Sequence, residues 1–287
     1  MNKNYILLPV FNDWKSLNKV LKILNKNFKK NKSTNHVIII NDASTTKISL
    51  SKSFNYFASI KILTLKKNVG SQKAIFFGLK YLQKKLKRDN DESVISILDS
   101  DGEDNPSKLN ELIKLANQKK EFFIFASRKK RTESIYLRSL NLIRLFLTYF
   151  LTGRYINFGN FSSFSSNILP KLLINNNLYL AYPAGVLKNY NKFIFLKVEK
   201  NKRFFGNSKV NFSFLLEHSI NIISVFYLTT LLRSSLIIFL IFLIFENNYL
   251  KIISIILLLI LNISLFYINL FLKPKKTNLS IVKNLIN

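Results

Sequence analysis

Apolar and polar positions follow two different periods along the first half of the chain. Segments with apolar residues at helical spacing, Trp14–Phe28 and Gln72–Lys87, separate short and almost continuously apolar runs. Runs of that length and composition predict β-strands, and they cover Tyr5–Val10, Val37–Ile40, Ile60–Leu65, Val94–Leu98 and Phe122–Ala126.

Strands that alternate with helices predict right-handed βαβ units and a mostly parallel sheet, which is an α/β fold. The continuously apolar strands fit a sheet that is buried on both faces. In such sheets ligands bind at the carboxyl ends of the strands. Asn12, Asp42, Asp99 and Asp101 each follow a predicted strand. The sequence therefore predicts a site where these side chains converge.

The last third of the chain is much more apolar. Val225–Phe245 and Ile252–Leu272 each reach the length of about 20 residues that a membrane-spanning helix needs. The short link Glu246–Lys251 makes them a hairpin, and the basic stretch Lys273–Lys276 predicts that both ends lie in the cytoplasm. A buried helix pair in a soluble protein is the alternative.

Two further helical segments and one charge bear on the relation of this hairpin to a membrane. Phe212–Val225 mixes apolar residues with Ser, His and Asn, as in an amphipathic helix on a membrane surface or in an ordinary domain helix. Leu137–Leu151 allows the same two interpretations. Arg233 lies inside the first span, where it would snorkel to the interface or pair with an anionic head group.

The chain is strongly basic, with 44 Lys and Arg against 15 Asp and Glu and a formal net charge of +29. This balance favours an anionic partner: nucleic acid, an anionic membrane surface or phosphorylated substrates. The Lys residues are scattered, and the abundance of Lys, Asn and Ile also fits an AT-rich coding sequence. No aromatic-basic motif of a nucleic-acid-binding kind is present, so nucleic acid is not expected as a partner.

Cysteine is absent, which excludes disulfides, thiolate metal sites and Cys nucleophiles, and which fits a reducing compartment. The first apolar stretch is short and is interrupted by Pro9, unlike the core of a signal peptide. We therefore expect the N-terminal part of the chain to stay in the cytoplasm.

Four of the 15 acidic residues fall within Asp99–Asp104, directly after a predicted strand. Two carboxylates one residue apart at a strand end suit Mg²⁺ or Mn²⁺, which take oxygen ligands and bridge substrate phosphates. The alternative is an acidic turn in which Asp104 or Asn105 caps a helix that begins near Pro106. The candidate metal ligands are Asp99, Asp101 and Glu103.

Motifs follow the first four predicted strands in a fixed order: Leu8-Pro9-Val10-Phe11-Asn12-Asp13, Ile40-Asn41-Asp42-Ala43-Ser44, Asn68-Val69-Gly70 and Leu98–Pro106. Further along are Ser127-Arg128 with Arg131, then Phe205-Gly206-Asn207-Ser208-Lys209, then Leu231-Leu232-Arg233. In order and spacing these motifs resemble the family 2 glycosyltransferases. Within that family they are most similar to the polyprenyl-phosphate sugar transferases of the dolichyl-phosphate mannose synthase group.

The resemblance implies a GT-A fold, an α/β domain that takes a sugar nucleotide and a divalent metal, Mg²⁺ or Mn²⁺. By position, it implies nucleotide binding by Pro9, Asn12, Asp42, Asn68 and Asp99. It assigns the metal to Asp99, Asp101 and Glu103, and catalytic roles to Asp101, Arg128 and Arg131. The phosphates of acceptor and donor would meet Arg203, Ser208 and Lys209.

The sequence departs from the family pattern at several positions. Asn41-Asp42 stands where an Asp-Asp pair is usual, and Glu103 stands where a Gln is usual. The segment Asn157–Ser162 lacks a basic residue that the family has there. This last departure leaves the identity of the acceptor or the sugar open.

The resemblance and the apolar hairpin together predict an inverting, metal-dependent transfer of one sugar from a UDP- or GDP-linked donor to a membrane polyprenyl phosphate. One alternative is a glycosyltransferase that acts on a growing glycan or glycolipid. Another is a non-catalytic membrane scaffold derived from such an enzyme, and a homo-oligomer is left open.

The expected organisation follows the same features. A GT-A catalytic domain covers residues 1–211, a membrane-proximal amphipathic helix 212–224, two transmembrane helices 225–272 and a basic cytoplasmic tail 273–287. We expect a multi-pass protein of the inner (cytoplasmic) membrane, with its catalytic domain in the cytoplasm.

Overall fold

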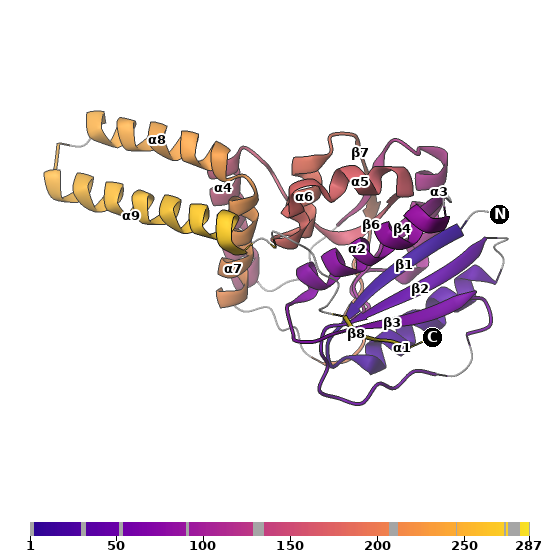
Figure 1. The fold of residues 1–287 in the computed structure, drawn as a ribbon. Coiled ribbons are helices and arrows are strands. Elements are labelled where there is room, and N and C mark those ends of the chain that lie inside the picture. The colour runs from indigo at the N-terminus through magenta and orange to yellow at the C-terminus, as the bar shows by residue number, and fades with distance from the viewer. Residues whose placement is uncertain are drawn as a thin grey trace.

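The computed structural model describes residues 3–29, 33–51, 54–89, 92–128, 135–206, 212–244, 246–272, 274 and 282–286. An α/β domain forms one end of the molecule, and a pair of long helices projects from it (Figure 1). Two further helices lie across the base of this pair, between it and the α/β domain.

The centre of the α/β domain is a sheet whose described strands follow the order β7-β5-β6-β4-β1-β2-β3-β8. The neighbours β4, β1, β2 and β3 are parallel, and so are β5 and β7. β6 runs antiparallel between β4 and β5, and β8 runs antiparallel along β3. The strands are Lys3–Val10 (β1), Thr34–Asn41 (β2), Ser59–Leu65 (β3), Ser93–Ile97 (β4), Phe123–Arg128 (β5), Phe158–Ser165 (β6), Phe193–Val198 (β7) and Val282–Ile286 (β8).

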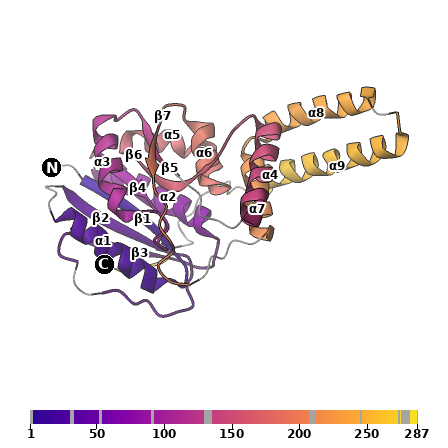
Figure 2. The same cartoon turned by 180° about the vertical axis from the view of Figure 1, so that it is seen from behind.

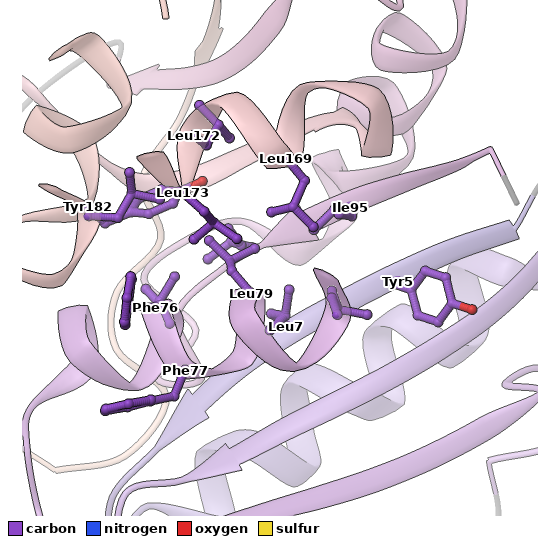
Figure 3. Close-up of a cluster of buried hydrophobic side chains, with 14 of the residues drawn as sticks. Tyr5, Leu7, Phe76, Phe77, Leu79, Ile95, Leu169, Leu172, Leu173 and Tyr182 are labelled. Carbon is purple, nitrogen blue, oxygen red and sulfur yellow. The ribbon is translucent and has the colours of Figure 1, made fainter. Parts of the chain in front are cut away.

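Helices cover both faces of this sheet. Neighbouring residues of a strand point to opposite faces of the sheet, so β1 contributes side chains to two hydrophobic cores. Ile6 and Leu8 pack with α1 and α3 on one face. Tyr5 and Leu7 pack with α2 on the other face (Figure 3). Burying one such Leu or Ile side chain contributes roughly 1.5–3 kcal/mol. The helices of this domain are Trp14–Phe28 (α1), Ser71–Asp89 (α2), Leu109–Gln118 (α3), Leu169–Leu172 (α5) and Tyr182–Asn189 (α6), with 3₁₀ turns at Pro106–Lys108 (η1), Ser166–Ile168 (η2) and Ile174–Tyr179 (η3).

The predicted strands and the mostly parallel α/β sheet are confirmed, whereas β6, β7 and β8 are not among the predicted strands. β7 has the apolar sequence FIFLKV, which fits the pattern used for the other strands, so it is a strand that the prediction missed. β6 has the sequence FGNFSSFS, in which serines replace the expected apolar residues. Ser162 and Ser163 are fully buried all the same, and Ser163 Oγ lies 2.7 Å from Ser96 Oγ of β4. Hydrogen bonds allow these polar hydroxyls to be buried, so β6 is a buried strand that a search for apolar residues does not find.

The projecting helices are α8 (Tyr227–Ile244) and α9 (Asn248–Tyr267), the latter continued by a π-helical turn, η4 (Ile268–Leu272). They contact each other and run side by side away from the sheet (Figures 1 and 2). Both are long and apolar enough to cross a membrane, yet only 11% and 6% of their apolar windows are buried inside the protein. Helices so little covered by protein do not fit the alternative of a buried pair in a soluble protein.

The two helices at the base of this pair are α4 (Ile135–Thr152) and α7 (Phe212–Val225). α4 contacts both α7 and α8. Large apolar side chains stay exposed on α4, among them Leu142, Ile143 and Phe146. Of the two interpretations that the sequence allowed for this segment, an exposed apolar face fits the membrane-surface helix better.

Arg233 of α8 has a protein partner. Its Nη1 donates to the carbonyl oxygens of Tyr149 and Phe150 at 3.2 and 2.9 Å, in the last turn of α4. Gly153 follows that turn with φ +71°, and a Cβ there would lie 2.6 Å from Arg233 Nη2. A cation at a helix C-terminus satisfies carbonyl groups that have no partner within the helix. Arg233 therefore connects α8 to α4, and the snorkelling or head-group pairing that the sequence suggests stays a prediction.

β8 returns the chain to the sheet after the helical pair. Leu285 pairs with Leu63 and Ile286 with Ile62, antiparallel to β3. The residues expected to form a basic tail thus include a strand of the central sheet. Five residues are too short a run for the apolar pattern to separate a strand from a tail.

Candidate functional site

The polar residues that follow β1, β2 and β4 lie at one edge of the sheet, where the sequence predicts a site. Val10 and Asn41, the last residues of β1 and β2, are paired in parallel register, and β4 ends nearby at Ile97, opposite Leu7 of β1. Pro9 lies within β1, opposite Ile40. The loops after β1, β2, β3 and β4 therefore begin as neighbours.

Asn12 joins the loop after β1 to the loop after β2. Its Oδ1 accepts hydrogen bonds from the backbone N–H groups of Thr45 and Thr46 at 2.8 and 3.1 Å. Its own N–H donates to Ser44 Oγ at 3.0 Å. Asn12 has φ 55°, a left-handed conformation that Asn tolerates better than most residues. Its amide oxygen is thus occupied in shaping the loops.

Asp42 joins the end of β2 to the loop after β3. Its two carboxylate oxygens accept the backbone N–H groups of Val69 and Gly70, each at 2.8 Å. Burial raises the pKa of this carboxyl, and the two hydrogen bonds partly oppose that shift. The turn needs Gly70, which has φ +87°. Asp42 thus holds the loop after β3. Asn68, a predicted nucleotide ligand that directly precedes Val69, is exposed in this loop.

The acidic segment after β4 is a loop that folds back on itself. Asp104 Oδ2 accepts the N–H of Asp99 at 2.9 Å, and Asp101 Oδ1 accepts the N–H of Glu103 at 2.9 Å. The 3₁₀ turn that follows is capped by Asn105, whose side chain accepts the N–H of Ser107. Of the two predicted caps, Asn105 caps the helix and Asp104 closes the loop.

Asp101 lies where negative charge is concentrated. Burial raises the pKa of its carboxyl to about 6, and the neighbouring Asp99 and Glu103 carboxylates add to this effect, whereas Arg203 opposes it. Removing a carboxylate from water and placing it beside other carboxylates both favour the protonated form. A divalent cation would remove this penalty, so the electrostatics of the loop fit a metal.

Arg203, which follows β7, lies between two of these carboxylates. Its Nη2 donates to Asp13 Oδ2 at 2.6 Å, and its Nη1 donates to Asp101 Oδ2 at 3.3 Å. Its Nε donates to the carbonyl of Phe205 at 2.9 Å, which fixes the plane of the guanidinium. This contact places one of the predicted phosphate-binding residues at the acidic loop.

Glu103 forms an ion pair with Lys200. Among the described residues, no group of three Asp, Glu, His or Cys side chains is arranged to hold a metal ion. Asp99, Asp101 and Glu103, the three predicted metal ligands, are thus not assembled around one point in the described structure. Asp99 and Asp101 still fit Mg²⁺ or Mn²⁺, because such ions are commonly held by one or two carboxylates and by substrate phosphates.

The segment after β7 covers the acidic loop. The N–H groups of Asn201 and Phe204 donate to the carbonyls of Glu103 and Asp101 at 2.9 and 3.0 Å. The Phe204 ring lies against Gly102, where a Cβ would be 2.3 Å from a ring carbon. Residues 199–206, which we call the covering segment, are therefore fitted to the backbone of the loop.

Some predicted site residues fall outside what the structure describes. Arg131, Ser208 and Lys209 lie between the described ranges, and Arg128 is described only as the last residue of β5. Its backbone pairs with Val198, directly before the covering segment. The predicted roles of these four residues remain predictions.

The sequence matches the model of the family described as Glycosyl transferase family 2 over residues 5–171. The chain belongs to this family. The match extends from β1 into α5, so it includes the strand ends and the acidic loop. The fold is the GT-A type of nucleotide-sugar glycosyltransferase, and the chain is an enzyme of that class.

Two solved structures, with TM-scores of 0.50 and 0.52, agree with this assignment at the level of the fold. TarS 1-349 from S. aureus in complex with UDP-GlcNAc is 17% identical, with a TM-score of 0.50 over 81% of this chain and 69% of that one. A crystal structure of a mycobacterial protein has a TM-score of 0.52 at 11% identity, covering 81% and 74%. A glucosyl-3-phosphoglycerate synthase from Mycobacterium tuberculosis in complex with Mn²⁺, UDP and glucosyl-3-phosphoglycerate has a TM-score of 0.46 at 13% identity, covering 81% and 80%. No curated protein matches the sequence at a significant level.

The site of this family 2 chain includes residues that sequence reasoning missed. Asn160 Nδ2 of β6 donates to Asp99 Oδ1 at 3.1 Å, and Gln72 Nε2 of α2 donates to Asn160 Oδ1 at 2.9 Å. Asp13, besides pairing with Arg203, caps α1 by accepting the N–H of Ser16. The cap has a sequence signal, an Asp directly before a helical pattern. The amides of Asn160 and Gln72 have no such sequence signal, because only β6, which is not predicted as a strand, brings Asn160 between Gln72 and Asp99.

Proposed function

We propose that this enzyme transfers one sugar, with inversion, from a nucleotide-sugar donor to a membrane polyprenyl phosphate, and that it needs Mg²⁺ or Mn²⁺. The single observation that carries the proposal is the pair of little-covered apolar helices joined to a family 2 domain that has its carboxylates at the strand ends. An enzyme of this build is suited to an acceptor that lies in a membrane.

Asp99 and Asp101 are the proposed ligands of the cation. When bound, the cation stabilises the charge that develops on the departing nucleoside diphosphate. Arg203 already lies against Asp101, and it would pair with a donor phosphate by the bidentate geometry that guanidinium groups favour. Arg128, Arg131, Ser208 and Lys209 are proposed to meet the remaining phosphate oxygens.

The nucleoside is proposed to lie over the ends of β1, β2 and β3. Asn12 and Asp42 would contribute mainly by holding the loops there, since their side-chain oxygens accept backbone N–H groups. Pro9 and Asn68 complete the proposed pocket. UDP is the first nucleotide to test, because the S. aureus TarS structure of similar fold holds UDP-GlcNAc.

The acceptor needs no strong base in this reaction. A polyprenyl phosphate is already ionised near neutral pH, so its oxygen can attack the anomeric carbon without losing a proton. The chemical difficulty lies in the departing diphosphate, where a cation and Arg side chains act. This fits a site without a conspicuous general base.

The proposed membrane arrangement uses four helices. α8 and α9 span the bilayer, and α4 and α7 lie along its surface, with the exposed apolar face of α4 toward the lipid. Two spans return the chain to the side on which it started, in accord with the pairing of β8 with β3. With the basic residues after α9, this gives an inner-membrane protein with a cytoplasmic catalytic domain.

The test uses the full chain in detergent or nanodiscs with Mn²⁺ or Mg²⁺, polyprenyl phosphate and a panel of radiolabelled UDP- and GDP-sugars. We expect label in a lipid fraction that mild acid releases, and loss of transfer in Asp101→Ala. Absence of transfer from every donor, with no effect of Asp101→Ala, would contradict the proposal.

A growing glycan or glycolipid is the second candidate acceptor. The segment Asn157–Ser162 has no basic side chain to meet a lipid phosphate, and Ser162 is fully buried. This alternative predicts a labelled product that is stable to mild acid, so the same assay separates the two acceptors.

A further inference from the structure

Asn160 faces Asp99 because of the register between β4 and β6. These strands are antiparallel, and Ile97 pairs with Ser162. Continuing that register past the end of β4 brings residue 160 opposite residue 99. Asn160 Nδ2 then donates to Asp99 Oδ1 at 3.1 Å. Only 6% of Asn160 is exposed, so its amide groups need partners within the protein.

A second amide continues this contact away from the acidic loop. Gln72 Nε2, in the first turn of α2, donates to Asn160 Oδ1 at 2.9 Å. Gln72 Oε1 accepts the backbone N–H of Tyr182, the first residue of α6, at 2.7 Å. Four groups, on three elements and the loop after β4, thus form one chain of hydrogen bonds, which we call the amide relay: Tyr182 N–H, Gln72, Asn160 and the Asp99 carboxylate.

The direction of every hydrogen bond in the amide relay follows from its ends. The backbone N–H of Tyr182 can only donate, so the Gln72 atom facing it must be the oxygen. The Gln72 nitrogen then faces Asn160, whose oxygen must accept, which turns the Asn160 nitrogen toward Asp99. A carboxylate is an acceptor, so both ends agree.

Tyr182 also holds the backbone of Asn160. Ser162 Oγ donates to the Asn160 carbonyl at 2.8 Å, and this bond uses the only hydroxyl proton of Ser162. Tyr182 OH, 2.8 Å from Ser162 Oγ, must therefore donate to it. Tyr182 and Ser162 are both fully buried. Tyr182 thus supports Asn160 indirectly at two points, through Gln72 at its side chain and through Ser162 at its carbonyl.

We propose that Gln72 and Asn160 are positioning residues, which act through the amide relay to aim the Asp99 carboxylate at the cation and diphosphate of the donor. The proposal rests on the donor role of Asp99 proposed above. Groups that orient a metal-binding carboxylate typically change metal affinity 10–100-fold when they are altered. In this chain two neutral amides contribute to that orientation through the contact of Asn160 with Asp99.

The competing explanation is that the relay only ties α2, β6 and α6 together. Two substitutions of Gln72 separate the explanations. One keeps the hydrogen bonds between the elements but reverses the Asn160 amide, and the other removes those hydrogen bonds but leaves the Asn160 amide able to donate to Asp99. Gln72→Glu can still accept from Tyr182 N–H and can accept from Asn160 if that amide turns over, so the tie is kept. The turned amide then points its oxygen at Asp99. Gln72→Met breaks the tie but leaves Asn160 free to donate to Asp99.

The experiment measures the apparent affinity for Mn²⁺ at a fixed UDP or GDP concentration by calorimetry, with the full chain in detergent. We expect Gln72→Glu and Asn160→Ala to bind about 10-fold or more weakly. Gln72→Met should bind within a few fold of the wild type but unfold at a lower temperature. Gln83→Glu, the same substitution on the same helix, is the control and should bind as the wild type does.

The sign of the Gln72→Glu effect is decisive. An added negative charge attracts the cation and repels the diphosphate, and Gln83→Glu reports the net effect of such a charge on the same helix. Weaker binding in Gln72→Glu but not in Gln83→Glu is therefore assigned to the turned amide. The relay proposal would be overturned if Gln72→Glu bound Mn²⁺ as tightly as the wild type or more tightly, or if Asn160→Ala bound Mn²⁺ as the wild type does. Loss of Mn²⁺ binding in Asp99→Asn would show in either case that the proposed role of Asp99 itself still holds. If the wild type binds no Mn²⁺ with either nucleotide, the donor-site proposal itself fails, and the relay proposal with it.

Discussion

Arg203 and Asp13 are 190 positions apart in the sequence, yet Arg203 Nη2 donates to Asp13 Oδ2 at 2.6 Å. The same guanidinium reaches Asp101 at 3.3 Å. One cation is thus shared by the cap of α1 and by the acidic loop. In the proposed reaction it is also a partner for phosphate, so its carboxylate contacts compete with donor binding.

Removing this cation should have opposite effects on metal and on nucleotide. Arg203→Gln leaves Asp13 and Asp101 without their shared counter-charge, so Mn²⁺ alone should bind severalfold more tightly. The nucleotide sugar should bind roughly 10-fold more weakly, because a charged phosphate contact is lost. Calorimetry measures both affinities.

Lys202→Gln is the matched control for this substitution. Lys202 is exposed on the same covering segment, so the change in net charge is the same. It should alter neither affinity by more than about twofold, because exposed charges are well screened. Equal effects of the two substitutions would assign the result to net charge rather than to the Arg203 contacts.

Gly102→Ala should loosen the covering segment. Gly102 has φ +86°, and an added Cβ would lie 2.3 Å from the Phe204 ring. Gly206→Ala separates the two causes, because Gly206 has φ +71° and open space around its Cβ position. We expect backbone strain of about 1 kcal/mol in both variants. The collision should lower the melting temperature further, and weaken donor binding, in Gly102→Ala alone.

Arg233→Gln should weaken the junction between α4 and α8. The carbonyls of Tyr149 and Phe150 would lose a charged donor at the end of α4, which is worth about 0.3–1 kcal/mol for a side chain as exposed as that of Arg233. Thermal unfolding in nanodiscs checks this loss, and Arg233→Lys should restore part of it. Arg154→Gln, an exposed neighbour of the same turn, is the control.

His218 of α7 should make stability depend on pH. Burial lowers the pKa of its imidazole to about 4, and the nearby Arg144 adds to that shift. The unfolded state therefore binds more protons between pH 4 and about 6.5, and the free energy of unfolding should fall by at most about 3 kcal/mol as the pH drops through that range. Denaturant titrations of wild type and His218→Phe measure the difference, which should vanish above pH 7.

The parallel half of the sheet is readable from the sequence because its strands are apolar on both faces. β1, β2, β3 and β4 are such strands, and the residues at their ends lie together as predicted. β6 is not readable in this way, because its buried positions are serines whose hydroxyls are satisfied only by distant partners such as Ser96. A composition-based pattern cannot show a partner.

The site follows the same division. Asp99 and Asp101 are recognisable because carboxylates are rare in this chain and cluster after a strand. Asn160 and Gln72 are common residue types, and only the register of an unpredicted strand brings them to Asp99. The resemblance implies that Asp42 binds the nucleotide, and in the structure its two carboxylate oxygens accept the Val69 and Gly70 N–H groups. No spacing rule reveals that use.

The junction of Arg233 with the end of α4 has a consequence for substrate choice. α4 contacts α7, and α7 contacts α6 of the α/β domain, so in the proposed membrane arrangement a hairpin joined to α4 sets a fixed height of the strand ends above the lipid. An enzyme whose site lies at a fixed height above the membrane suits acceptors whose reacting oxygen lies at a constant distance from the membrane surface. A phosphate directly on a lipid chain meets that condition, whereas the growing end of a glycan moves farther from the membrane with each sugar added.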